Sequence, residues 1–192
     1  LKSFNQQYSS NSTPRQQHQA LKKFLNSLGY SEDGYISEAE DAARMQEADR
    51  LLSGYSQDTT GDYMGVPEHV QQNVEALMGG VSQRLPEATF SDALVSYVET
   101  KGLREPSERS SLQRVERVAS FVNDALGFDP DLRSLKRQDA RSVVEFMQGD
   151  LEIAASTCRR YLNDLRAIFN HGCLELDVIR ETPNPFVGLD PK

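Results

Sequence analysis

Apolar side chains recur at helical spacing through most of the chain, and this feature constrains the fold more than any other. Residues three or four positions apart share one face of a helix, whereas a half-buried strand alternates apolar and polar residues. Further segments repeat the helical pattern, and no stretch alternates over a useful length. The sequence therefore predicts an all-α protein. The first such segment contains Ala20, Leu21, Phe24, Leu25 and Leu28.

Three helices are predicted within residues 14–80, after a lead over 1–13 that is rich in Ser, Asn and Gln and predicted to be disordered. The first helix ends at Gly29. The second is opened by Ser37 with Glu40 three residues later, the pattern of a capping box. The third has Pro67 at its first position and carries an apolar stripe that includes Met78. Together these helices predict a small N-terminal helical unit.

Four more helices are predicted over residues 89–181, after a short linker at 81–88 that contains Pro86. The first is opened by Thr89 and ends at Gly102, and the second runs from Pro106 to Gly127. The third covers about 137–148, and Ser156 is predicted to cap the fourth. Residues 182–192 read as a Pro-rich linker. The chain is therefore predicted to hold two helical parts.

Charge and hydropathy exclude several classes of protein. No apolar run approaches the ~18 residues of a membrane span, and no secretion signal is visible, so we expect a cytoplasmic protein with no membrane partner. The formal net charge is −8, with 21 basic and 29 acidic side chains, which argues against a general polyanion binder. However, binding is done by one face, so the distribution of charge matters more than its sum.

Cysteine and histidine provide no redox or metal chemistry that the sequence can predict. Cys158 and Cys173 are 15 positions apart on one predicted helix, about 22 Å, too far for a disulfide. The three histidines are scattered, and we expect no cofactor and no metal. Residues 29–40 resemble a calcium loop, although Gly29 stands where a carboxylate is expected; the matching positions are Ser31, Asp33, Gly34, Ile36, Ser37 and Glu40. A turn followed by a capping box accounts for the same residues without a metal.

Basic residues gather in three places in the second half of the chain. On the last predicted helix Arg159, Asn163, Arg166 and Asn170 follow the spacing i, i+4, i+7, i+11 and share one side, with Arg160 beside them. Arginine can pair with phosphate or guanine, and asparagine with adenine. An ordinary solvated helix face explains the same row. The other candidate DNA-binding residues are Ser110, Arg114 and Arg117 on the second helix, and Lys136, Arg137 and Arg141 at the third.

The segment from Thr89 to about Pro191 resembles the N-terminal core-binding, SAM-like domain of phage integrases, which are tyrosine recombinases. The matching pieces are a Thr89-Phe90 helix start, a long helix ending in Leu126-Gly127, and the run 134–140 that leads into the third helix. The run 156–169 resembles the fourth helix of the family, and Asn184-Pro185-Phe186 resembles the linker into the catalytic domain. Arg159 stands where the family often has Asn.

This resemblance implies a module that clamps core-site double-stranded DNA with the second and fourth helices of the 89–181 domain. It also implies DNA integration and recombination as the setting, with a parent recombinase that is tetrameric on DNA. The family's His-x-x-Arg motif is absent from the sequence, so we expect no catalytic residues, no enzymatic activity in this chain, and a largely monomeric fragment. The alternative is a helical protein-interaction module with no DNA role.

Overall fold

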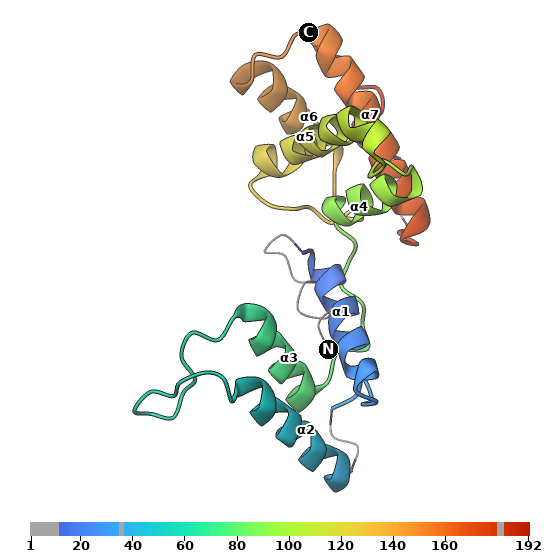
Figure 1. The fold of residues 1–192 in the computed structure, drawn as a ribbon. Helices are drawn as coiled ribbons and strands as arrows, with labels where there is room; N and C mark the ends of the chain where they lie inside the picture. Colours follow the sequence, from blue (N-terminus) through green and yellow to red (C-terminus); the bar gives the residue numbers. More distant parts are fainter. Residues whose placement is uncertain (1–11, 35–36, 180–182) are drawn as a thin grey trace. The chain divides into compact units, whose positions relative to one another are not determined.

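The computed structural model describes residues 12–34, 37–179 and 183–192. Within these ranges the chain forms seven α-helices and no strand, which confirms the all-α prediction (Figure 1). Most of the predicted lead, Ile36 and the start of the predicted C-terminal linker lie outside these ranges. Among the described helices, none is both long enough and apolar enough to cross a membrane.

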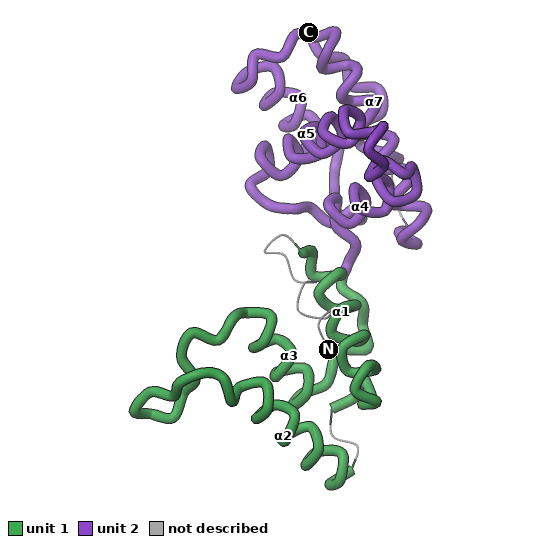
Figure 2. The backbone as a smooth tube through the Cα atoms, viewed as in Figure 1, with its two compact units in different colours: residues 1–86 green, residues 87–192 purple. Residues whose placement is uncertain are grey.

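The chain divides into two compact units, Leu1–Pro86 and Glu87–Lys192 (Figure 2). The boundary falls inside the segment 81–88, where the sequence analysis placed a linker. Unit 1 contains α1 Pro14–Ser27, α2 Glu38–Leu52 and α3 Glu68–Gly79. Unit 2 contains α4 Phe90–Thr100, α5 Arg109–Leu126, α6 Arg137–Glu145 and α7 Ala155–Glu175.

Unit 1 buries few apolar side chains, because its helices are rich in polar residues. Thr13 caps α1 in a capping box with Gln16, and Pro14 occupies the first helical position. α3 packs against both α1 and α2. The described apolar core cluster of this unit consists of Leu25, Ala48, Ala76 and Leu77, with partly buried neighbours around it.

A buried arginine occupies the centre of unit 1. The Arg44 side chain on α2 is 2% exposed, and its guanidinium donates to the Glu40 carboxylate at 2.7 and 3.0 Å. It also donates to the backbone carbonyls of Ser31 at 2.7 Å, Asp33 at 2.9 Å and Leu77 at 3.1 Å. The hydrogen bonds from Arg44 lower the pKa of the Glu40 carboxyl. An organic cation thus binds the Glu40 carboxylate that the calcium-loop pattern assigned to a metal, together with the backbone carbonyls of Ser31 and Asp33.

Two glycines allow the chain after α3 to reach the loop before α2. Gly80 has φ of +71°, and a Cβ there would lie 2.4 Å from the Gly34 backbone nitrogen. Only glycine fits such a conformation and such a contact. Next to it the Val81 N–H donates to the Glu32 carbonyl at 2.7 Å. This backbone contact closes the loop over Arg44.

Unit 2 is built around the contact between α4 and α7, the most extensive between any two helices. Thr89 caps α4 in a capping box with Asp92, as the sequence predicted. The helices approach closely at Gly172, where a Cβ would lie 2.2 Å from the Ala93 Cβ. The core cluster here is much larger than in unit 1 and draws on all four helices and on Phe186, which follows α7. Long apolar stripes explain this difference, because each buried side chain contributes hydrophobic stabilisation.

Several helix boundaries differ from the sequence predictions. Pro67 is the N-cap and not the first helical residue, since its ψ of 146° is extended and α3 begins at Glu68. Ser156 lies inside the first turn of α7, which starts at Ala155. The predicted helix over 137–148 ends as an α-helix at Glu145, and residues Phe146–Asp150 continue as a π-helix.

Two further predictions differ from the structure. The capping box at Ser37 is only half formed, and Met78 is not buried. The Ser37 side chain accepts from the Glu40 N–H, but the Glu40 carboxylate accepts from Ser31 and Arg44 instead of returning to Ser37. Met78, predicted on the buried stripe of α3, is 47% exposed, whereas Ala76 is buried. The reason is that α3 contacts two neighbouring helices, so its buried face is turned from the simple stripe.

Candidate nucleic-acid interface

The predicted row on α7 exists in the structure. Arg159, Asn163, Arg166 and Asn170, which we call the α7 row, lie along one side of the helix, and Arg166 donates to the Asn163 side-chain oxygen at 2.9 Å. The opposite side of α7 is buried in the core through Leu162, Leu165, Ile168 and Phe169. Helical periodicity was therefore sufficient to bring the four side chains together.

The α7 row holds the C-terminal residues 183–192, which we call the tail. Arg166 Nε donates to the Phe186 carbonyl at 2.9 Å, and the Asn184 side chain donates to the Asn170 side-chain oxygen at 2.8 Å. Arg159 donates to the Asp190 carboxylate at 2.9 and 3.1 Å. Each residue of the row thus has at least one polar group bound within the chain itself.

The basic residues predicted at α6 also divide between the tail and the surface. Arg137, the first residue of α6, donates to the backbone carbonyls of Val187 and Gly188, the latter at 2.9 Å. Lys136 is the N-cap of α6, and its N–H donates to Asp139 at 2.7 Å. Lys136 and Arg141 are exposed. The predicted cluster is therefore split, because its central arginine is turned to the tail.

A second basic surface joins α5 and α7. Arg117 on α5 donates to the Tyr161 hydroxyl at 2.6 Å, and its Cζ lies 5.7 Å from the Tyr161 ring centroid. Arg160, the residue before this tyrosine, places its Cζ 5.8 Å from the same centroid. The tyrosine is buried, whereas both arginines are exposed. Two cations from different helices are therefore held against one aromatic ring by cation–π attraction.

Arg114 and Ser110 extend this surface along α5. Arg114 Nε lies 3.2 Å from the Asp164 carboxylate on α7, and Ser110 lies one turn earlier on α5 and is exposed. We call the four residues the α5–α7 face: Ser110, Arg114, Arg117 and Arg160. Because Asp164 offsets the charge of Arg114, the positive charge of the face comes mainly from Arg117 and Arg160.

The described residues offer no group of three or more His, Cys, Asp or Glu side chains that could hold a metal. Neither Cys158 nor Cys173 forms a disulfide. Burial raises the pKa of the Cys158 thiol, so the reactive thiolate is disfavoured there. The Cys158 thiol is therefore a weaker nucleophile than an exposed cysteine.

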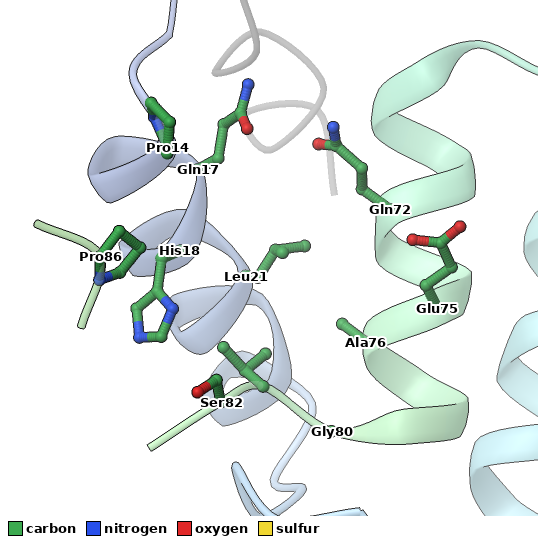
Figure 3. Close-up of a pocket in the computed structure, with 11 residues that line it drawn as sticks. Pro14, Gln17, His18, Leu21, Gln72, Glu75, Ala76, Gly80, Ser82 and Pro86 are labelled. Atoms are coloured by element: carbon green, nitrogen blue, oxygen red, sulfur yellow. The ribbon is translucent and has the colours of Figure 1, made fainter. Parts of the chain in front are cut away.

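Unit 1 contains a cavity of about 350 Å³ between α1, α3 and the chain that follows α3 (Figure 3). Its walls carry Gln17 and His18 from α1 and Gln72 and Glu75 from α3. His18 is 7% exposed and lies beside Pro86. Burial, with a smaller contribution from Lys22, lowers the pKa of this imidazole. The cavity wall therefore carries a histidine whose neutral form is favoured.

Sequence reasoning missed the partner of the α7 row and of Arg137. The available signal was Asn184-Pro185-Phe186, a short polar and Pro-containing segment with one large aromatic residue that a linker exposed to water would not require. Phe186 is 0% exposed, so the segment is an integral part of unit 2. In comparisons with protein-family models, with curated proteins and with solved structures, no match was found.

Proposed function

We propose that unit 2 binds double-stranded DNA and is the core-binding part of a phage-integrase-like tyrosine recombinase, with a SAM-like four-helix arrangement. The observation that carries the proposal is the pair Arg117 and Arg160, both exposed and both held against Tyr161. Two like charges fixed near one ring repel each other, and a polyanion relieves that repulsion. The resemblance of residues 89–191 to the family supplies the DNA class.

The proposed contact surface is the α5–α7 face. It combines the second and fourth helices of unit 2, the two that the resemblance assigns to the clamp. Arginine matches phosphate geometry through its planar fork of donors, and Ser110 can add a hydroxyl contact to the backbone. Most of the affinity would come from phosphate contacts, which position the protein without reading sequence. Unit 2 would then contribute affinity and orientation, and the chain alone would break no bond.

Salt dependence of binding tests the proposal. The full chain is titrated against a labelled mixed-sequence duplex, and fluorescence anisotropy gives the dissociation constant at several salt concentrations. The logarithm of the binding constant should fall linearly with the logarithm of salt, with a slope of about −0.9 for each phosphate contacted. In the variant Arg117→Gln/Arg160→Gln the slope should be shallower by about two units.

Arg50→Gln is the matched control, because Arg50 is also an exposed helical arginine but lies in unit 1, where it pairs with Glu47. It should leave the slope unchanged. If the double variant and the control bind alike, the α5–α7 face is not the interface. If no variant shows salt-dependent binding, the DNA proposal fails and the protein-interaction alternative becomes the better one.

A nicked suicide duplex tests the absence of chemistry. The three histidines of the chain are followed three positions later by Leu, Gln and Leu, so no His-x-x-Arg motif is present to assist attack by a tyrosine. We expect no covalent protein–DNA product on denaturing gels. A covalent product that survives denaturation would contradict the assignment of this chain as a binding module.

A further inference from the structure

The tail is fixed to unit 2 by two kinds of contact that differ in burial. Its apolar contact is Phe186, whose ring meets Phe90 and Phe169 edge-on at centroid distances of 6.0 and 6.2 Å. The carbonyl of the same residue accepts from Arg166, whose side chain is partly buried. This part of the tail belongs to the core of unit 2, and displacing it would expose an aromatic ring to water.

The polar contact near the end of the tail lies in water. Both Nε and one terminal nitrogen of Arg159 donate to a single oxygen of Asp190. The side chains are 54% and 82% exposed. An ion pair this exposed adds little to stability, because water and salt screen it. The Asp190 carboxylate can therefore leave Arg159 while the buried Phe186 stays in place.

The guanidinium of Arg159 is held in position independently of that carboxylate. Its terminal nitrogen also donates to the Pro191 carbonyl at 3.0 Å, and Pro191 is buried against unit 2. Arg159 lies in the second turn of α7. The backbone of the tail thus orients the arginine, and the Asp190 side chain accepts from Nε and from this same terminal nitrogen.

We propose that Arg159 is a phosphate-binding residue and that the Asp190 carboxylate is its internal competitor, occupying the position that a DNA phosphate takes in the complex. This inference rests on the proposed DNA-binding function and specifies how one contact of it is controlled. In the free protein Asp190 neutralises Arg159. On DNA a phosphodiester oxygen replaces the carboxylate, and the tail backbone remains docked through Phe186 and Pro191.

The test compares Asp190→Asn with Asp177→Asn in the full chain, using the same duplex and anisotropy measurement. Both changes remove one negative charge, but Asp177 follows the far end of α7, about 27 Å from Arg159 by helical rise. Asp177 has φ of +53°, a conformation that asparagine also tolerates. Asp190→Asn should bind DNA about two- to fivefold more tightly at low salt. Its salt slope should be steeper by about 0.9, the contribution of one additional phosphate.

Adding Arg159→Gln to Asp190→Asn should remove the gain, because the arginine is the residue set free. Equal affinities for the two aspartate variants would show a general charge effect and would overturn the inference while leaving DNA binding intact. Loss of hydrogen-exchange protection at 184–188 in Asp190→Asn would make Asp190 a structural clip, which also overturns it. Absence of DNA binding in every variant would instead remove the proposed function itself, and this inference with it.

Discussion

The two units are stabilised by opposite means. In unit 1 a charged guanidinium lies at the centre and organises backbone carbonyls from the loop before α2 and from α3. In unit 2 the centre is apolar, and polar groups such as the α7 row lie at the margin and hold the tail. The units show that helices of similar length can be assembled either around one directional network or around distributed apolar burial.

The difference has an energetic consequence. Apolar burial is spread over many side chains, so one loss in unit 2 removes a fraction of its stability. A buried charge is tolerated only while all its partners are present, because its desolvation cost is large. Unit 1 should therefore respond to the loss of one residue more completely than unit 2 does.

Replacing Arg44 by methionine should have the largest effect. Arg44→Met leaves three buried or half-buried carbonyls without the arginine donor and leaves the Glu40 carboxylate with the Ser31 N–H. Leaving a buried acceptor without its donor typically costs about 1–3 kcal/mol for each acceptor. Hydrogen exchange followed by mass spectrometry should show protection lost over residues 12–80 and retained over 89–179. Arg50→Met, on the exposed side of the same helix, is the control, and equal protection in the two variants would contradict a polar centre.

Replacing Phe186 by alanine should have a similar or slightly smaller effect, confined to unit 2. The ring is fully buried between α4 and α7, and removing a buried phenylalanine typically costs about 3–5 kcal/mol. The neighbouring Val187 is 51% exposed, so Val187→Ala should change stability little. The free energy of unfolding from urea titration measures both. If Phe186→Ala is as mild as the control, the tail is not part of the core.

Gly172→Ala should destabilise unit 2 by about 1–3 kcal/mol, since the added Cβ would overlap the Ala93 Cβ at 2.2 Å. Gly149→Ala is the control, because a Cβ there meets nothing within 4 Å and the residue has no positive φ. Removing the opposing methyl group in Gly172→Ala/Ala93→Gly should recover part of the loss. If Gly172→Ala leaves the free energy of unfolding unchanged, α4 and α7 can move apart without cost.

The apolar pattern was sufficient to predict the all-α class and the order of the helices, because burial repeats with the helical period. It could not predict the centre of unit 1. A charged residue on an acidic helix is ordinarily exposed, and nothing in the spacing of Arg44 reveals that loop carbonyls surround it. The spacing of apolar residues predicts an apolar core, but it does not predict a buried centre made of backbone carbonyl oxygens.

At the candidate site the sequence pattern predicted where the residues lie on the helix but not which groups they bind. Spacing correctly placed the four residues of the α7 row on one side of the helix. However, Arg166 binds a backbone carbonyl, and phosphate oxygens and carbonyl oxygens accept hydrogen bonds from arginine in much the same way. Only the folded tail distinguishes the two partners. The pairing of Arg117 with Tyr161 could not be predicted either, because the two residues are 44 positions apart in the sequence.

The smallest predicted effect concerns pH and distinguishes the units once more. Burial lowers the pKa of His18 in unit 1, with Lys22 acting in the same direction and Glu32 opposing it. The folded unit thus binds the proton less readily than the unfolded chain, whose histidine has a pKa of about 6.5. The contribution of neutral His18 to stability is complete above that value and is lost as pH falls below it. Urea unfolding followed by exchange protection of α1 should therefore show a modest loss of stability between about pH 7.5 and pH 5.5, above the range in which carboxylates titrate.

His18→Phe is the control for this pH dependence. It keeps an aromatic ring at this position but cannot titrate, so the free energy of unfolding of this variant should not change over the same interval. A slope that persists in His18→Phe would assign the pH dependence to another group and remove His18 from the account of unit 1.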